Sequence, residues 1–172
     1  MQMLVEGEIT SPSGGRLCRQ DLSPKCLYLG WSLALNLSLP GCRGPVIPRC
    51  QLVRILRQYG LEGFGRRSGA DWVCLARHKS CYNTKAINCS KNGSSDYGIF
   101  QINSKYCGYD GRTLGASNGG CHMPCSKLLD NNIADDIRCA KLNARKARGL
   151  MPWVAWKKCC RGKDLKPYVR GC

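Results

Sequence analysis

The sequence predicts an α+β fold with a helical lobe and a small antiparallel β lobe. Two amphipathic helical patterns come first, a hairpin signal at Asn92-Gly93 follows, and further helical patterns end the chain. This succession of helices, one small sheet and helices again is typical of α+β domains. At 172 residues the chain is long enough to bury a hydrophobic core. We expect a ligand site in the cleft between the two lobes.

Two helices are expected before the hairpin. The first spans Cys50 to Tyr59, because its apolar residues recur with helical spacing. The second begins at Ser68, since Ser68-Gly-Ala-Asp71 resembles a capping box, and it runs to about Lys79 or Ser80. The residues expected on the buried face of the first helix are Leu52, Val53, Leu56 and Tyr59.

The middle of the chain changes to the spacing of strands. Asn92-Gly93 is a strong signal for a hairpin turn. Residues Ala86 to Cys89 precede this turn and Tyr97 to Ile102 follow it, so we expect one strand on each side.

Two more helices are expected in the C-terminal part. The longer one extends from about Ile133 to Arg148, with acidic residues in its first turn and basic residues in its last. Gly149 is expected at the position just after its end. The segment Pro152-Trp-Val-Ala-Trp156 opens the other helix, since proline is tolerated in a first turn.

The first 45 residues differ in character from the remainder. We divide the chain into residues 1–45, a leader-like extension, and residues 46–172, a domain with 23 basic and 8 acidic residues. Leu27 to Leu39 is an apolar run of 13 residues, suitable for a signal-peptide core and too short to span a bilayer. The usual positive segment before it is missing, so an incorrectly assigned first exon or a degraded leader is the alternative.

Charge and cysteine content narrow the classes of function. With 27 Lys and Arg against 11 Asp and Glu, the net charge is +16 and polyanions will attract the chain. The basic residues are scattered and carry no zinc-finger, RNP-like or helix-turn-helix signature, so we expect no specific nucleic-acid partner. The 14 cysteines, about 8 % of the residues, are typical of a disulfide scaffold and lack the paired CxxC motifs of zinc sites. Disulfides persist in oxidising compartments, so we expect a secreted, extracellular protein.

Three sequence stretches resemble those of a known family. They are Ala70-Asp-Trp-Val-Cys-Leu-Ala76, Asp96-Tyr-Gly-Ile-Phe-Gln-Ile-Asn-Ser104 and Trp153-Val-Ala-Trp-Lys-Lys158. By these motifs residues 46–172 resemble the C-type lysozyme/α-lactalbumin family over essentially the whole segment, and in particular its calcium-binding lysozymes. The resemblance implies the lysozyme-like two-lobe fold with four disulfides.

The resemblance also implies a disulfide pairing, which spacing alone does not choose. The implied bridges are Cys50–Cys172, Cys74–Cys160, Cys107–Cys125 and Cys121–Cys139. Each is expected to stabilise the fold by roughly 3–5 kcal/mol in the chain-entropy model. Cys81, Cys89 and Cys159 have no family counterpart, and a domain cut near residue 45 holds 11 cysteines, an odd number. At least one would then be free or intermolecular, and a Cys81–Cys89 bridge is an alternative for two of them.

The family's chemistry needs two carboxyl groups, of which one has a match. Retaining glycosidases place a general acid and a nucleophile or stabiliser about 5–5.5 Å apart, and lysozyme is the type case. By resemblance Asp96 takes the nucleophile position; otherwise it is an ordinary turn aspartate beside a hairpin. Lys79 takes the general-acid position. A protonated amine can donate in principle, but it repels an oxocarbenium ion, so we expect it to pair with Asp96 and leave hydrolysis weak or lost.

The sugar-binding cleft is partly retained. By resemblance the residues that contact the glycan are Asn88, Gln101, Asn103, Tyr106, Trp153 and Val154. The family's tryptophan after Tyr106 is absent, which moves Cys107 by one position and predicts an altered local geometry. Asn88-Cys-Ser90 and Asn92-Gly-Ser94 are glycosylation sequons, and a glycan on Asn88 would lie in the cleft.

A second set of residues predicts a structural calcium ion. The segment from Lys127 to Asp136 places three carboxylates in a loop that leads into a helix, and calcium takes six to eight oxygen ligands. By resemblance the ligands are the side chains of Asp130, Asp135 and Asp136 and the carbonyls of Lys127 and Asn132. The alternative is that acidic residues in a first helical turn only favour the helix dipole.

Two functions remain open, so the sequence leaves undecided whether the chain is an enzyme. The first is hydrolysis of the β-1,4 bonds of peptidoglycan by a secreted antimicrobial lysozyme, which Lys79 opposes. The second is a non-catalytic, calcium-binding protein that binds a glycan or acts on anionic bacterial surfaces through its charge. In both cases we expect a monomer without a transmembrane segment, whose partner is bacterial cell-wall glycan or an anionic bacterial surface.

Overall fold

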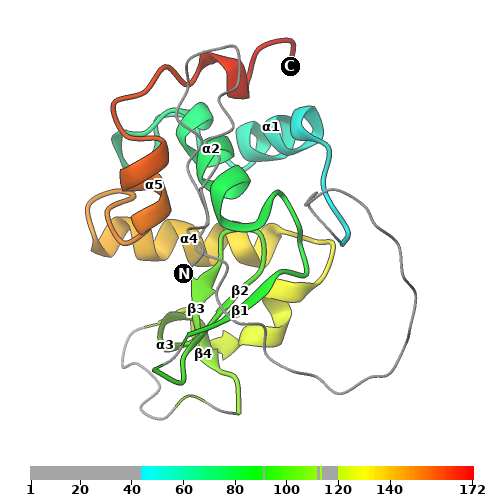
Figure 1. The fold of residues 1–172 in the computed structure, drawn as a ribbon, viewed down its shortest axis with the longest axis vertical. Coiled ribbons are helices and arrows are strands. Elements are labelled where there is room, and N and C mark those ends of the chain that lie inside the picture. The colour runs from blue at the N-terminus through cyan, green and yellow to red at the C-terminus, as the bar shows by residue number, and fades with distance from the viewer. Residues whose placement is uncertain (1–43, 91, 112, 114–119) are drawn as a thin grey trace, which may run out of the picture.

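The computed structural model describes residues 44–90, 92–111, 113 and 120–172, and it has the two expected lobes (Figure 1). The α-helices are α1 (Arg49–Gln58), α2 (Gly69–Ser80), α3 (Ser104–Cys107), α4 (Ala134–Lys146) and α5 (Val154–Cys159). The strands are β1 (Ile87–Cys89), β2 (Ser95–Tyr97), β3 (Ile102–Asn103), β4 (Gly108–Tyr109) and β5 (Met123–Pro124). Short 3-10 helices cover Phe64–Arg66, Cys125–Leu129 and Lys166–Tyr168. The prediction of an α+β, two-lobe fold is confirmed.

Helix α2 is the central element of the helical lobe, where it packs against α1 and α5. Its start is the predicted capping box: the Ser68 hydroxyl accepts from the Asp71 N–H, and the Asp71 carboxylate accepts from the Ser68 N–H at 3.0 Å. The residues from Trp72 to Ala76 are all buried. The indole of Trp156 donates to Asp71 Oδ1 at 2.9 Å, which fastens α5 to the first turn of α2.

The β lobe is a three-stranded antiparallel sheet in the order β1-β2-β3. Asp96 on the central strand lies opposite Asn88 on β1 and Asn103 on β3. The predicted hairpin between β1 and β2 is present. Strands β4 and β5 form a separate parallel pair.

The single strand expected from Tyr97 to Ile102 is wrong, because the chain turns between these residues. Strand β2 ends at Tyr97, Gly98 to Gln101 form a turn, and β3 begins at Ile102. Gly98 has a φ of +73°, and a Cβ there would come within 2.3 Å of both Asp136 Oδ1 and the Leu128 carbonyl. The turn thus lies directly against the start of α4, which only glycine permits.

The two C-terminal helices differ in detail from the prediction. Helix α4 ends at Lys146, and Arg148, with a φ of +54°, takes the left-handed position expected for Gly149. The Gly149 N–H donates to the Ala144 carbonyl at 2.8 Å, as in a Schellman motif. Helix α5 begins at Val154 and not at Pro152, because Trp153 has an extended backbone and serves as the residue before the first turn.

The four bridges implied by the resemblance are confirmed: Cys50–Cys172, Cys74–Cys160, Cys107–Cys125 and Cys121–Cys139. Cys81, Cys89 and Cys159 are also disulfide-bonded, so the expectation of a free cysteine is wrong for the described residues. The bridges found between described residues do not include the alternative Cys81–Cys89 pair. Of the leader-like segment, only positions 44 and 45 belong to the described part. None of the helices in that part has the length and apolar character needed to span a membrane.

Candidate functional site

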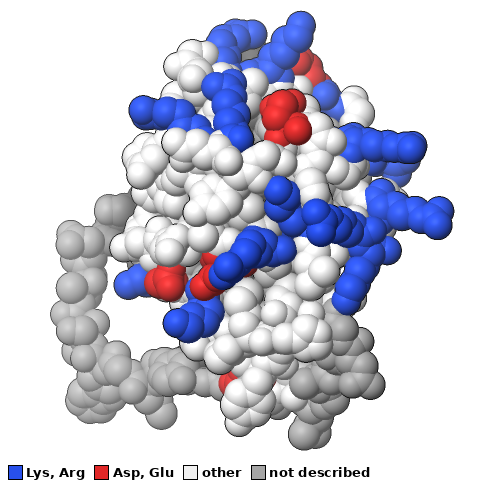
Figure 2. Space-filling view, turned by 180° about the vertical axis from the view of Figure 1, so that it is seen from behind, with Lys and Arg blue, Asp and Glu red and all other residues white. Residues whose placement is uncertain are grey.

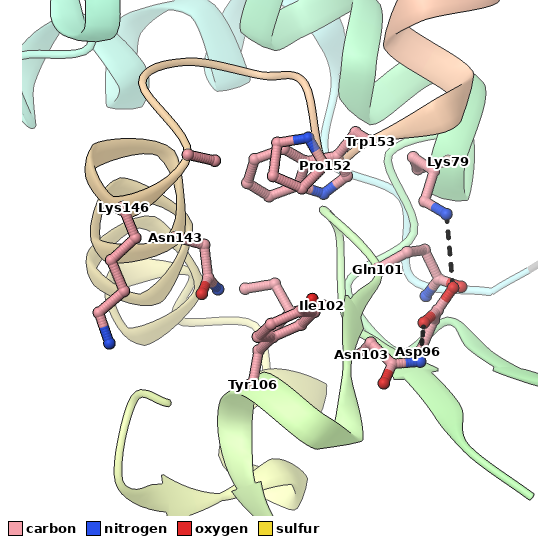
Figure 3. Close-up of a pocket in the computed structure, with 11 residues that line it drawn as sticks. Lys79, Asp96, Gln101, Ile102, Asn103, Tyr106, Asn143, Lys146, Pro152 and Trp153 are labelled. Atoms are coloured by element: carbon pink, nitrogen blue, oxygen red, sulfur yellow. Dashed lines mark hydrogen bonds and ion pairs between the residues drawn. The ribbon is translucent and has the colours of Figure 1, made fainter. Parts of the chain in front are cut away.

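A pocket of about 370 Å³ lies between the two lobes, a volume typical of small-molecule sites (Figure 3). Six predicted site residues line it: Lys79, Asp96, Gln101, Asn103, Tyr106 and Trp153. The lining is completed by Ile102, Asn143, Lys146, Ala147 and Pro152. The prediction of a cleft between the lobes is confirmed, and most of the residues expected in it are brought together.

Lys79 and Asp96 form the expected ion pair at one side of the pocket (Figure 3). Lys79 comes from the last turn of α2, where the negative end of the helix dipole favours a cation. Its Nζ lies 3.4 Å from Oδ2 of Asp96, and the two side chains are 23 % and 22 % exposed. The pair is therefore half-buried and within reach of a ligand in the pocket.

The other oxygen of Asp96 is also engaged. Asn103 on β3 donates from Nδ2 to Asp96 Oδ1 at 2.9 Å and to Ser94 Oγ at 2.9 Å. Its Oδ1 accepts from the Lys105 N–H at 3.1 Å. Both carboxylate oxygens of Asp96 and both ends of the Asn103 amide are thus held within the protein.

Asp96 is the only carboxylate among the described residues that line the pocket. A double-displacement glycosidase needs a second carboxyl about 5–5.5 Å away, which acts as acid and then as base. The charged group next to Asp96 in this pocket is instead the ammonium of Lys79. The arrangement can hold a ligand, but its described residues lack a carboxylic acid that could protonate a leaving group.

Gln101 is positioned by a set of hydrogen bonds that reaches Asn88. Its side-chain amide is almost completely buried, donates to the carbonyls of Ala86 and Gly98 at 2.9 Å each, and accepts from Asn88 Nδ2. Asn88 is not among the residues that line the pocket, and its amide donates to Gln101. Val154 is likewise not among the lining residues; it is 52 % exposed at the start of α5.

Two aromatic side chains give the pocket its apolar surface. Trp153 is buried, donates from Nε1 to the Phe100 carbonyl at 2.9 Å and packs edge-on against Trp72 with ring centroids 6.2 Å apart. Tyr106, by contrast, is 49 % exposed and stands at the opposite edge (Figure 3). A sugar ring between them would meet one fixed and one accessible aromatic group.

The wall contributed by α4 was not expected from the sequence. Asn143, Lys146 and Ala147 line the pocket from the C-terminal end of this helix. Their spacing of three and four residues places them on one face of a helix. That spacing is visible in the sequence, but which face of the helix meets the pocket depends on the packing of the two lobes.

The predicted calcium loop contains a buried carboxylate. Asp136 is fully buried; its Oδ1 accepts from the Ile99 N–H at 3.3 Å, and its Oδ2 has no hydrogen-bond partner within the described structure. Burial raises the pKa of Asp136 to about 8. An unpartnered buried carboxylate oxygen is the kind of atom that a bound cation would satisfy.

The other two predicted carboxylate ligands, Asp130 and Asp135, have partners close in sequence. Asp130 accepts from the Asn132 N–H at 2.7 Å, and Asn132 accepts from the Ala134 N–H at 3.2 Å. Asp135 forms an ion pair with Arg138. Among the described residues, the three aspartates do not form a cluster whose carboxylate oxygens all lie within 4.8 Å of one another. The ligand types suit calcium, but the side chains are not gathered around one point.

Comparisons with known proteins agree on one family. A sequence model of the C-type lysozyme/alpha-lactalbumin family matches residues 45–172. The chain is 48 % identical to lysozyme C-2 of Sus scrofa over 140 residues, which cover 81 % of this chain and 94 % of that protein. It is 49 % identical to lysozyme C of Colobus angolensis over 141 residues, which cover 81 % and 95 % of the two chains. Lysozyme C-1 of Sus scrofa is 50 % identical over 127 residues, with 74 % and 98 % covered.

Proposed function

Because the chain belongs to the C-type lysozyme/alpha-lactalbumin family, we propose that it is a glycan-binding relative of lysozyme whose hydrolysis of β-1,4 bonds is weak or lost. The observation that carries this proposal is the 3.4 Å ion pair between Lys79 and Asp96. In a retaining glycosidase one carboxylic acid protonates the leaving oxygen, and a carboxylate stabilises or captures the glycosyl cation. This pocket has an ammonium in place of the acid.

Three physical effects of Lys79 oppose hydrolysis. First, general acid catalysis contributes about 10²–10⁴-fold, and the carboxylic acid that would supply it is missing. Second, a positive charge beside the scissile bond repels the oxocarbenium ion that develops in the transition state. Third, the ammonium offsets the charge of Asp96, which Asn103 also holds through a hydrogen bond. The carboxylate is therefore a weaker stabiliser of positive charge than a lone aspartate would be.

The pocket nevertheless keeps what a saccharide site needs. It has an apolar wall at Trp153, an accessible aromatic ring at Tyr106 and a polar wall of amides on β3 and α4. We infer that the ligand is a glycan of the bacterial cell wall. The four disulfide bridges support a secreted, extracellular protein, since such bridges persist in oxidising compartments.

A second candidate function is supported by the surface charge. Figure 2 shows Lys and Arg side chains spread over one face of the helical lobe, with few acidic groups between them. With a net charge of +16, the chain would be drawn to anionic bacterial surfaces independently of the pocket. This candidate predicts antibacterial activity that depends on salt and survives changes in the pocket.

A structural calcium ion belongs to the same proposal. The unpartnered oxygen of Asp136 and the raised pKa of this buried carboxyl support a cation at the start of α4. Asp130 and Asp135 would supply further carboxylates, and the carbonyls of Lys127 and Asn132 would supply neutral oxygens. Because Asp135 is paired with Arg138, binding would have to compete with that ion pair. The expected consequence is a melting temperature that rises with calcium and falls with chelator.

The experiment that tests the proposed function measures binding and hydrolysis in the same tube. The full chain is incubated with insoluble peptidoglycan, sedimented, and assayed for bound protein and for reducing sugar released into solution. We expect the protein to sediment with the wall without releasing sugar above the level of Asp96→Asn. Substitution of Trp153 by alanine should weaken sedimentation, whereas it should not if surface charge alone holds the protein. Rapid release of sugar would contradict the proposal.

A further inference from the structure

We propose that Asn92 carries an N-linked glycan and that Asn88, the asparagine of the other sequon, stays unmodified. This inference rests on the proposed secretion of the chain, because N-linked glycans belong to secreted proteins. It adds a covalent modification that the proposed function does not contain. The sequence offers both Asn88-Cys-Ser90 and Asn92-Gly-Ser94 and does not choose between them.

Asn92 lies on the turn between β1 and β2, where the surface is open. Asn92 and Gly93 are both exposed, and a Cβ built at Gly93 would meet no atom within 4 Å apart from its neighbours in the chain. Sequons that carry a glycan are expected on surface loops, because a sugar chain is bulky and hydrophilic. The turn thus gives a glycan on Asn92 an unobstructed path away from the protein.

The hydrogen bonds of this turn leave the side-chain nitrogen of Asn92 free. Its Oδ1 accepts from the Ser94 N–H at 3.1 Å and from Ser94 Oγ at 2.8 Å. Within the part of the chain that the structure describes, its Nδ2 donates to no acceptor. The oxygen of the carboxamide is therefore fixed toward the turn, and the nitrogen that would be glycosylated has no contact to give up.

The serine of this sequon anchors the turn from the inside. Ser94 is buried, and its Oγ accepts from Asn103 Nδ2 at 2.9 Å. Asn103 also donates to Asp96 in the pocket (Figure 3). A sugar on Asn92 Nδ2 leaves all of these bonds in place, because they use Asn92 Oδ1 and the Ser94 hydroxyl. The folded chain therefore accommodates the modification without a change at the pocket.

The Asn88 sequon lies in a different environment, within strand β1. Asn88 is opposite Asp96 in the antiparallel sheet, and its Nδ2 donates to Oε1 of Gln101. Gln101 is almost completely buried and donates to the carbonyls of Ala86 and Gly98. A sugar on Asn88 Nδ2 would start from a nitrogen that already faces the protein, and it would disturb the bond to Gln101. The fold therefore disfavours a glycan here, although Asn88 itself is exposed.

The modification is a group transfer from an oligosaccharide linked to a lipid pyrophosphate. Asn92 Nδ2 forms a bond to C1 of the first sugar, and the bond between C1 and the pyrophosphate oxygen breaks. The pyrophosphate leaves with the electron pair of that bond, and Nδ2 loses one of its two protons. No group is oxidised or reduced in this step.

The test locates the glycan on the full chain, expressed in a eukaryotic cell line that makes only high-mannose glycans. One arm uses the chain's own N-terminus and the other adds a signal peptide before it. The protein is treated with an endoglycosidase that leaves one N-acetylhexosamine on each modified asparagine, and then with trypsin. Trypsin cuts after Lys91, so Asn88 and Asn92 fall in separate peptides whose masses show which one carries the sugar. We expect the sugar on the Asn92 peptide and none on the Asn88 peptide.

Two variants give an independent reading by gel mobility. Asn92→Gln should abolish the mobility shift that the endoglycosidase causes. Asn88→Gln is the matched control, because it makes the same change at the other sequon, and it should leave the shift unaltered. The peptide masses of the natural chain decide the inference even if a variant fails to fold.

Sugar on the Asn88 peptide alone, or on both peptides equally, would overturn the inference. Its absence from both peptides in the arm with the added signal peptide would also overturn it. Sugar on the Asn92 peptide in that arm alone would support the site and contradict the proposed secretion of the natural chain. Spontaneous deamidation of Asn92 adds no hexosamine and cannot imitate any of these results.

Discussion

Replacing Asp136 by asparagine is predicted to stabilise the metal-free protein near neutral pH. Burial raises the pKa of Asp136 to about 8, against an ordinary value of 3.8 in the unfolded chain. Between these two values the folded state keeps a proton that the unfolded state has lost. The free energy of unfolding therefore falls as the pH rises from about 4 to about 8. Asparagine has nearly the same shape and does not titrate, so this loss should disappear in the variant.

The expected size of the effect follows from the two pKa values. At about 1.36 kcal/mol for each pH unit, the interval from 3.8 to 7 gives a loss of roughly 4 kcal/mol for the natural chain, as an upper limit. When stabilities are referred to pH 4, the free energy of unfolding of Asp136→Asn at pH 7 should exceed that of the natural chain by that amount in the presence of chelator. With calcium present the natural chain should be more stable than Asp136→Asn, since calcium stabilises the natural carboxylate and the variant has lost a charged ligand.

The assay is urea unfolding followed by tryptophan fluorescence, carried out at several pH values with chelator and with calcium. Asp164→Asn is the matched control, because Asp164 is exposed and lies outside the proposed calcium loop, so its loss should leave the difference between chelator and calcium unchanged. Parallel pH profiles for the natural chain and Asp136→Asn in chelator would refute the assignment of the raised pKa. If calcium leaves the free energy of unfolding of the natural chain unchanged at every pH, the proposed calcium site is refuted.

Three further predictions concern single contacts. Ser68→Ala removes the capping box of α2 and should lower the free energy of unfolding by roughly 0.5–2 kcal/mol in urea titrations, and an unchanged midpoint would contradict that cap. Trp153→Phe removes the donor to the buried Phe100 carbonyl and should cost roughly 1–3 kcal/mol in the same assay; a loss of glycan affinity without any loss of stability would disagree with this account. Burial lowers the pKa of His78, so the folded state binds fewer protons than the unfolded state below pH 6.5, and stability should decrease as the pH falls. His78→Asn should flatten that decrease, and an unaltered slope between pH 7 and pH 5 would contradict it.

Much of the fold could be predicted because local patterns specify its helices and hairpin. The Ser68–Asp71 capping box fixes the start of α2, and the Asn92-Gly93 turn identifies the β1–β2 hairpin. The turn from Gly98 to Gln101 could not be predicted in this way. It exists because Gly98 meets Asp136 and Leu128, which are distant in sequence. The start of α5 at Val154 likewise depends on Trp153, whose indole is fixed to Phe100 and holds the chain extended there.

The candidate site was predictable where the resemblance supplies a position for a residue. Lys79, Asp96 and Trp153 line the pocket as the resemblance implies. Asn88 does not; it is exposed on strand β1, and its amide donates to Gln101. Lys146 was missed, since the family motifs do not include it and its place in the pocket depends on how α4 packs against the rest of the fold. The residue types in the family motifs thus predicted the chemistry of the site, but they did not predict which elements form its walls.

The most direct test of the central claim is the rate at which the protein clears a suspension of bacterial cell walls, compared with its Lys79→Glu and Lys79→Gln variants. A glutamate in the last turn of α2 would face the negative end of the helix dipole, which raises the pKa of a carboxyl and suits a general acid. We expect Lys79→Glu to clear walls at least tenfold faster than the natural chain, and Lys79→Gln to stay near the natural rate. A natural rate within tenfold of that of Lys79→Glu would contradict the claim that Lys79 suppresses hydrolysis.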